Sequence, residues 1–235
     1  MKSMYAIGPR RSTNWRLQYT EWELLNPDIN SYPKFDYFHN NWGFRSIDEE
    51  NYVLNDENDI WCFGCSFTVG IGVPVLNTWP AVIRKLTNYR KVKNFGVQGC
   101  GIQTIYRLMN SWYNAVDVKP KEIFVLGAFE GRSEVWCDTS ETYFLQQPNM
   151  FWDKPYDIEE VERTYKDLIP KVDSFKNITT RIDVQSLVRE TLDNKTYGKS
   201  RDSSEQVEKK FNVYGHPGKD FHKYTANKFL ELAKT

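Results

Sequence analysis

Short apolar runs alternate with stretches of helical periodicity through the middle of the chain. The runs at 59–65, 90–95 and 121–127 have the length and apolar content of buried strands, and the third is the most apolar. A helix is predicted to begin near residues 77–80. A second covers 102–115, where apolar residues recur on one face: Ile105, Leu108, Met109 and Trp112. Strands that alternate with helices predict a parallel sheet with helices on both faces.

At the two ends of the chain, apolar positions recur less regularly. Residues 1–58 mix aromatic side chains with Asn, Pro and Asp, and we expect an irregular wrap packed on a main domain of residues 59–235. The aromatic side chains of this wrap either line a pocket or only anchor it to the core. Toward the carboxyl end, helices are predicted at 158–168, at 183–192 and from about Lys219, but no fourth apolar strand is found.

Composition and charge exclude several classes of function. Lys and Arg together number 31, as do Asp and Glu, so the net charge of +0 favours neither nucleic acid nor an anionic membrane surface as a partner. No window approaches the roughly 20 apolar residues of a membrane span, and the N-terminal residues lack an apolar signal core. The four cysteines have neither the density of a disulfide scaffold nor a paired zinc-ligand spacing. We therefore expect a cytoplasmic protein with reduced thiols.

A serine follows the first predicted strand. The strand ends near Gly64, Ser66 comes two residues later, and Gly70 and Gly72 follow. Open α/β sheets bind their ligands at the carboxyl ends of their strands, so Ser66 is a candidate nucleophile. A serine in such a turn commonly serves only as a turn or helix-capping residue. Both interpretations stay open at this point.

Cys62 and Cys65 give the same stretch another interpretation, because Trp-Cys-x-x-Cys also occurs in thioredoxin-like redox sites. Such a site needs its first cysteine at the start of a helix, where the pKa of the thiol is lowered. The residues after Cys65 include glycines, β-branched residues and a proline, which form helices poorly. We therefore expect Cys62 inside the strand, and thiol chemistry is a minor alternative.

Three histidines are the candidate bases for Ser66. His39 belongs to the N-terminal wrap, and His222 lies within the last helix, where it is either structural or exposed. His216 lies in a loop just before that helix and can project toward the strand ends, and Ser–His activation is a common design. The backbone N–H groups of Ser66 and Gly99, in glycine-rich loops after neighbouring strands, are candidates for an oxyanion hole.

Taken in order, these loops resemble the sequence blocks of the SGNH/GDSL hydrolase family. Residues 64–70, Gly-Cys-Ser-Phe-Thr-Val-Gly, are similar to its first block, and residues 94–99, Asn-Phe-Gly-Val-Gln-Gly, to its second. Residues 124–127 resemble the strand that opens the third block, and residues 215–218 resemble the fifth. The segment that ends at Gly43-Phe44-Arg45 is similar to an Asn-x-x-Gly-Phe-Arg motif found before the first block.

The resemblance implies a three-layer α/β/α sandwich with a parallel sheet, of the flavodoxin-like kind, and hydrolysis of carboxylic esters. Ser66 would be the nucleophile and His216 the base, with the N–H groups of Ser66 and Gly99 as donors to the oxyanion. The substrate would carry an acyl group, often acetyl, on a carbohydrate or lipid-like molecule. Neither a metal nor an organic cofactor is implied.

The sequence departs from the family pattern around the nucleophile and the oxyanion hole. Cys65 replaces the aspartate before the nucleophile, a side chain that does not carry out the attack. Phe129 stands where the third block supplies an asparagine to the oxyanion hole. Arg132, three residues later, is a charged donor that could take over this task.

A further departure concerns the acid that would orient the base. Val213 stands where an aspartate is expected three residues before His216. A backbone carbonyl could orient the imidazole instead, or an acid from elsewhere, with Asp202 and Asp220 as candidates.

We therefore predict a serine esterase acting on a small-molecule or carbohydrate ester, with Arg45 or Arg132 as possible substrate contacts. An alternative is a degenerate member of the family that binds such a ligand without hydrolysing it, because Phe129 and Val213 replace two expected groups. The least favoured alternative is a redox protein that uses Cys62 and Cys65.

Overall fold

The computed structural model of the chain describes residues 40, 43–45, 54–88, 91–137, 142–146, 157–197 and 216–234. The predicted N-terminal wrap lies mostly outside these ranges, so the division of the chain at residue 58 stays a prediction. No helix within the described ranges is both long and apolar enough to cross a membrane.

Four parallel strands form the central sheet, in the order β2-β1-β3-β6. Their bounds are β1 Ile60–Gly64, β2 Val92–Gly96, β3 Glu122–Leu126 and β6 Thr179–Ile182. The register pairs Gly64 with Gly96 on one side and with Leu126 on the other, and Leu126 with Ile182. All four strands therefore end at the same level, and the loops that follow them leave the sheet from a single edge.

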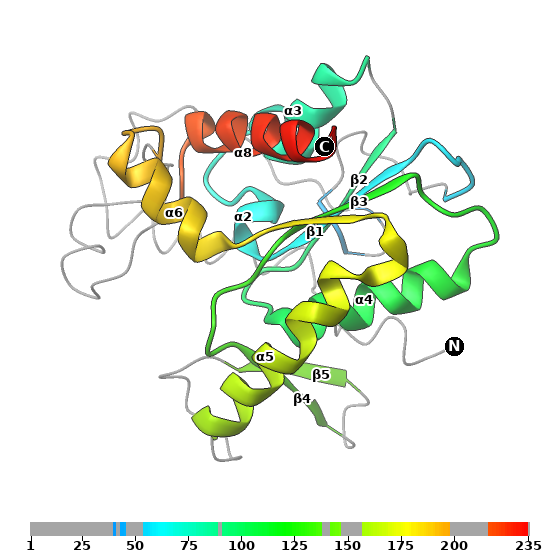
Figure 1. Ribbon diagram of the computed structural model, residues 1–235, viewed down its shortest axis with the longest axis vertical. Coiled ribbons are helices and arrows are strands. Elements are labelled where there is room, and N and C mark those ends of the chain that lie inside the picture. Colours follow the sequence, from blue (N-terminus) through cyan, green and yellow to red (C-terminus); the bar gives the residue numbers. More distant parts are fainter. Residues whose placement is uncertain are drawn as a thin grey trace.

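Helices cover both faces of this sheet (Figure 1). One face carries α3 and α8, which pack against each other, with α6 beside α8; the other carries α4 and α5. The bounds of these helices are α3 Trp79–Leu86, α4 Ile102–Ala115, α5 Ile158–Asp173, α6 Val184–Asp193 and α8 Lys219–Leu232. Three shorter helices are α2 Ser66–Val69, η3 Val75–Asn77 and η4 Phe175–Asn177. The predicted three-layer α/β/α sandwich with a parallel sheet is confirmed.

Aromatic side chains fill both spaces between the sheet and its helices. On one face, the Trp79 and Phe124 rings each stack on Phe229 of α8, with centroids 4.8 and 5.0 Å apart. On the other, Phe63 stacks on Phe95 at 4.9 Å. Phe44, which precedes the first strand, meets the Phe95 ring edge-on at 5.1 Å. All six side chains are buried, and offset or edge-on ring pairs add stability beyond the burial of apolar area.

The expectation that no fourth strand would be found is wrong, because β6 completes the sheet. Its sequence, Thr-Thr-Arg-Ile, carries one apolar side chain, and its first three residues are only partly buried at the edge of the sheet. The guanidinium of Arg181 contacts the Asp173 carboxylate, with Nε 2.5 Å from Oδ1. Because this edge strand is stabilised in part by polar contacts, its sequence lacks the apolar run by which a central strand is recognised.

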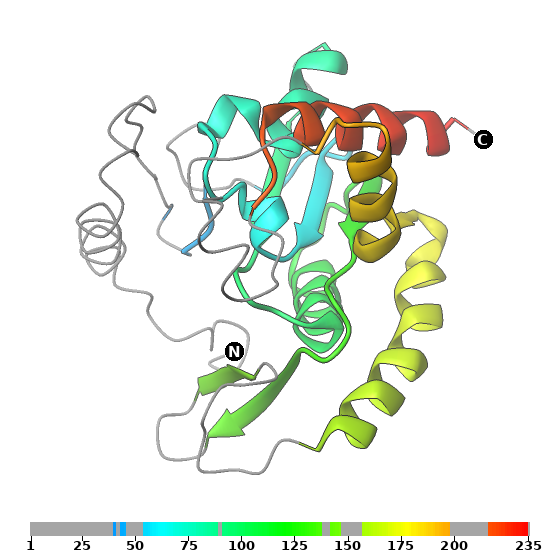
Figure 2. The same ribbon diagram turned by 90° about the vertical axis from the view of Figure 1, so that its left-hand side faces the viewer.

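Two further features of the carboxyl half differ from the prediction. An antiparallel hairpin, β4 Ser133–Cys137 and β5 Thr142–Gln146, stands apart from the main sheet (Figure 2). Helix α5 continues past the predicted end at residue 168 and contains Pro170.

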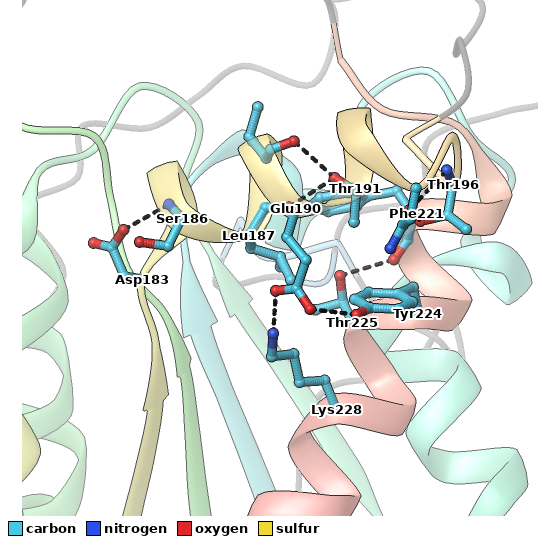
Figure 3. Close-up of polar contacts among 12 residues, drawn as sticks. Asp183, Ser186, Leu187, Glu190, Thr191, Thr196, Phe221, Tyr224, Thr225 and Lys228 are labelled. Atoms are coloured by element: carbon cyan, nitrogen blue, oxygen red, sulfur yellow. Dashed lines mark hydrogen bonds and ion pairs between the residues drawn. The ribbon is translucent and has the colours of Figure 1, made fainter.

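The last helix is fixed by polar contacts with α6 (Figure 3). The carboxylate of Glu190 on α6 accepts hydrogen bonds from the Tyr224 hydroxyl and the Lys228 ammonium on α8. Asp183 caps the start of α6 by accepting from the Ser186 N–H at 2.8 Å. These contacts matter for the site because the loop that carries His216 leads directly into α8.

Candidate active site

Ser66 opens a single helical turn, α2, at the carboxyl end of β1. Cys65 before it is extended, and Gly70 after it has a left-handed φ of 76° and donates its N–H to the Ser66 carbonyl. The Ser66 side chain is buried. This is the position in which open α/β sheets bind ligands.

Two glycines let α2 lie directly on the strand ends. A Cβ added to Gly64 would collide with the Thr68 hydroxyl and would lie 2.6 Å from the Leu126 carbonyl oxygen. A Cβ added to Gly96 would lie 2.5 Å from the Val69 nitrogen. The missing side chain at Gly96 therefore allows backbone-to-backbone contact between the turn and the sheet, and the one at Gly64 leaves room for the Thr68 hydroxyl.

Side chains from two other elements hold the same turn. The Asn94 amide of β2 donates to the Thr68 carbonyl at 2.9 Å, and its oxygen accepts from the Gly96 N–H at 2.9 Å. The Trp79 indole of α3 donates to the Thr68 hydroxyl at 3.3 Å. Asn94, Thr68 and Trp79 are all fully buried, so water cannot compete for these bonds.

Arg45 lies against the loop that follows α2. Its Nη1 donates to the carbonyls of Val69, at 3.1 Å, and Gly70, and its Nη2 donates to that of Val73 at 2.7 Å. The side chain is buried. In this position the guanidinium holds the shape of the loop after Ser66, and a direct contact between Arg45 and a substrate stays a prediction.

The loop after β2 is bonded to the end of β1, the strand that leads to Ser66. Val97 donates its N–H to the Gly64 carbonyl at 2.8 Å, and the Cys100 thiol donates to the same oxygen at 3.4 Å. Gly99, between them, has a left-handed φ of 74°. Because Gly64 is two residues before Ser66, the loop of Gly99 is held at the edge where Ser66 lies.

The loop of His216 reaches the turn of Ser66 from a distant part of the sequence. Its imidazole ring and the Phe67 ring have centroids 5.7 Å apart, and Phe67 directly follows Ser66. Gly218, two residues on, donates its N–H to the Tyr197 carbonyl at 3.0 Å. The Phe221 ring also packs edge-on against Phe67, at 5.6 Å. The structure thus brings the ring of His216, the predicted base, against Phe67, the residue that follows Ser66.

The acid for His216 is not found among the described residues. Asp202 and Val213 lie outside the described ranges. Asp220 is exposed in the first turn of α8, and no hydrogen bond or ion pair within the described part of the chain joins it to His216. The identity of the orienting group therefore stays a prediction.

The loop after β3 adds an aromatic ring and a charge to the same edge. The Phe129 ring lies edge-on to Phe67 with centroids 5.6 Å apart. The Arg132 guanidinium lies over the Phe129 ring, its Cζ 5.0 Å from the centroid. A Cβ added to Gly101 would lie 2.7 Å from the Arg132 carbonyl carbon, so the backbones of the second and third loops touch.

His222, left open by the sequence as structural or exposed, is fully buried. Its Nδ1 accepts from the Trp79 N–H at the start of α3, at 3.2 Å. Burial, with the nearby charges of Arg45 and His216, lowers the pKa of His222 to about 3. The imidazole is therefore neutral and caps α3. Sequence gave no signal for this contact, because the two residues are 143 positions apart.

The structure argues against the redox interpretation. Cys62 lies inside β1, fully buried, and burial raises the pKa of its thiol well above the usual value. A thioredoxin-like site requires the opposite shift. Neither Cys62 nor Cys65 forms a disulfide. Within the described ranges, no group of three His, Cys, Asp or Glu side chains is arranged to hold a metal ion.

The sequence matches no protein-family model, and no curated protein matches it. Solved structures do match. A member of the lipolytic protein G-D-S-L family from Veillonella parvula is 18% identical, with a TM-score of 0.44 over 75% of this chain and 98% of that chain. A lipolytic protein of the G-D-S-L family from Desulfitobacterium hafniense is 16% identical, with a TM-score of 0.40 over 75% and 99%. A carbohydrate esterase is 14% identical, with a TM-score of 0.40 over 79% and 67%. The predicted resemblance is confirmed in this sense: the solved structures to which the chain is similar include G-D-S-L proteins and an esterase.

Proposed function

We propose that the protein is a serine ester hydrolase in which Ser66 and His216 form the catalytic pair. One observation carries the proposal: the ring of His216 lies 5.7 Å from that of Phe67, beside Ser66, although 150 positions separate His216 from Ser66 in the sequence. A serine at the carboxyl end of a central strand, next to a histidine from a distant loop, is the arrangement that nucleophilic acyl transfer needs.

The reaction would run in two steps. Ser66 Oγ attacks the ester carbonyl while His216 accepts its proton; the alcohol then leaves with that proton, and an acyl-serine remains. Water, deprotonated by His216, attacks the acyl-serine and releases the acid. The N–H groups of Ser66 and Gly99 are the proposed donors to the oxyanion in both steps, and each such donor is worth on the order of 10²–10³ in rate.

The contacts around α2 support this assignment because they fix the nucleophile before substrate arrives. Asn94, Trp79 and Arg45 reach the turn from three different segments of the chain. Preorganised geometry of this kind removes much of the cost of orienting reacting groups. The proposed substrate is a small-molecule ester, with an acyl group on a carbohydrate or lipid-like alcohol. We propose a reducing, cytoplasmic setting, consistent with the buried thiols of Cys62 and Cys65.

The first test is labelling with a fluorophosphonate, which reacts only with an activated serine. We expect one adduct by intact mass, mapped to the peptide of Ser66 and absent in Ser66→Ala. His216→Ala should lose most of the labelling. Ser186→Ala, which removes an exposed serine on α6, is the matched control and should label like the parent. Turnover of an acetyl ester should fall at least about a thousandfold in Ser66→Ala, with unchanged thermal stability. Labelling that survives Ser66→Ala would remove Ser66 from the mechanism.

A second candidate function is binding without hydrolysis. The observation that favours it is Phe129, whose ring packs against Phe67 where the family pattern has an oxyanion donor. In that case no adduct forms, and calorimetry with acylated sugars shows binding without release of acid over hours. Measurable turnover that depends on Ser66 would exclude this candidate.

A further inference from the structure

Arg132 brings a positive charge to the edge of the sheet that holds the candidate active site. Among the described residues, its buried Nη1 has no hydrogen-bond partner and Arg132 takes part in no ion pair. A buried guanidinium nitrogen without a partner is costly, because it has lost water and gained nothing in exchange. Such a group is a candidate for binding a ligand.

Other arginines near the sheet are used differently. Arg107 on α4 makes a two-pronged contact with Glu134, with both N–O distances 2.8 Å. Arg181 on β6 pairs with Asp173 in the same way. Two acids lie two positions from Arg132 along the chain. Glu134 also accepts from the Thr104 hydroxyl at 2.9 Å, so its carboxylate is bonded to α4. Glu130 is exposed, and none of the ion pairs among the described residues joins it to Arg132.

The position of Arg132 is held by the two loops that flank it. Its guanidinium lies over the Phe129 ring, Cζ 5.0 Å from the centroid, an arrangement that favours the cation and limits its rotation. Its backbone lies against Gly101, two residues after the proposed oxyanion donor Gly99. Through Phe129, the charge is one ring away from Phe67, which follows Ser66. A guanidinium stacked on a ring by one face still presents its N–H edge to a ligand.

We propose that Arg132 binds a carboxylate of the substrate, so that the enzyme prefers esters that carry one negative charge near the scissile bond. The planar edge of a guanidinium matches the two oxygens of a carboxylate. A single carboxylate also balances a single positive charge, whereas a phosphate dianion would need a second cation. This inference rests on the proposed esterase function, since it names the class of ester that the Ser66 site accepts.

The test compares two esters of equal length. Mono-para-nitrophenyl adipate carries a terminal carboxylate, and para-nitrophenyl hexanoate has a methyl group in its place. We expect wild-type kcat/KM to be higher for the adipate ester. The ratio of the two kcat/KM values should fall about 10- to 100-fold in Arg132→Gln. It should recover in part in Arg132→Lys, which keeps the positive charge but lacks the paired N–H donors of the guanidinium. Arg163→Gln removes an exposed charge on α5 and is the matched control, with an unchanged ratio.

The outcomes separate the possible roles of Arg132. An equal loss with both esters in Arg132→Gln would assign it to the oxyanion and overturn the proposal, as would an unchanged ratio. If Arg132→Gln does not fold, the wild-type ratio is measured against salt: a ratio that falls as salt rises supports an ion pair with substrate, and a constant ratio overturns it. If neither ester is hydrolysed, the proposed esterase function has failed. Calorimetry with monomethyl adipate then still decides the carboxylate site, because binding must be present in the wild type and weaker in Arg132→Gln.

Discussion

Strand β1 ends in two contrasting environments. At its carboxyl end, the turn of Ser66 is bonded to its surroundings by Asn94, Trp79 and Arg45. At its amino end, Asp59 is equally buried, yet neither of its carboxylate oxygens accepts a hydrogen bond of normal geometry in the described part of the chain. Burial raises the pKa of Asp59 to about 6, against the opposing charge of Lys93.

The difference teaches where hydrogen bonds are needed in this fold. A nucleophile must stay within a fraction of an ångström of its working position, and several bonds from separate segments achieve that. An acid at the opposite end of the strand has no atom to position, and there the protein tolerates a group that costs stability when it is charged. At the carboxyl end of β1 hydrogen bonds fix the position of Ser66, whereas at the amino end Asp59 is buried without such bonds.

The largest effect is expected from Gly64→Ala, which breaks the contact between α2 and the sheet. The new methyl group would collide with Thr68 and lie 2.6 Å from the Leu126 carbonyl oxygen, and the left-handed φ of 155° adds strain. We expect ester turnover to fall at least about a hundredfold and the free energy of unfolding to fall by about 2–4 kcal/mol. Denaturant titration and kcat/KM measure the two effects.

Gly127→Ala is the matched control for this change. Gly127 follows β3, but a Cβ there would lie 3.4 Å from its nearest neighbour, the Ile182 carbonyl oxygen, which is an ordinary contact. The cost in stability should stay below about 1 kcal/mol. Equal losses for Gly64→Ala and Gly127→Ala would show that the close approach of α2 is not what makes Gly64 necessary.

A smaller effect is expected from Arg45→Met, which keeps the length of the side chain and removes its donors. The carbonyls of Val69, Gly70 and Val73 then lose buried hydrogen bonds, so the free energy of unfolding should fall by about 2–3 kcal/mol. Because the loop loses its shape, we expect kcat to fall more than KM rises. Arg45→Lys should recover only part of the loss. A rise in KM with unchanged kcat and stability would instead mean that Arg45 contacts substrate.

The smallest effect concerns the amino end and has the opposite sign. The folded-state pKa of Asp59, about 6, exceeds the unfolded value of about 4, so the folded protein binds more protons between these values. The free energy of unfolding should therefore fall as pH rises from about 4 to 6. Asp59→Asn should be more stable than the wild type by about 1–2 kcal/mol at pH 8, with little difference at pH 4. Chemical denaturation at several pH values measures this.

Asp56→Asn is the control for Asp59→Asn, because Asp56 is shifted in the other direction. Its pKa is lowered, first by the Asn58 N–H and then by Lys91, whose ammonium lies 3.3 Å away. A lowered pKa contributes stability above the unfolded value that is lost as pH falls. Asp56→Asn should therefore be the less stable protein at neutral pH. If both variants were more stable than the wild type at neutral pH, or both less stable, the unfavourable burial of the Asp59 carboxylate would be contradicted.

Most of the central sheet could be predicted from the sequence because burial on both faces leaves an apolar signal. The predicted helix over 102–115 coincides with α4, and the first three strands agree with prediction within two residues at each end. β6 was missed because Arg181 at the sheet edge is stabilised by Asp173, a contact that periodicity does not reveal.

Site residues that lie in short motifs directly after strands could be predicted from the sequence. Contacts between segments far apart in the sequence could not. Ser66 and Gly99 lie in glycine-rich loops directly after strands, which a sequence displays. The support of the loop by Arg45 and the capping of α3 by His222 depend on contacts across 24 to 143 positions. Charge gave no guide to His222 either, since its pKa is lowered only by burial and neighbours that exist in the folded chain.

The bond between Trp79 and His222 has a consequence for how the protein is made. Trp79 supports the turn of Ser66 through Thr68, yet its own backbone N–H donates to His222, a residue of α8. During synthesis, at roughly 5–20 residues per second, about 7 to 29 seconds pass between the addition of Trp79 and that of His222. A nascent chain that stops before α8 therefore has an incomplete site, and reactivity of Ser66 should arise abruptly once α8 has left the ribosome and docked.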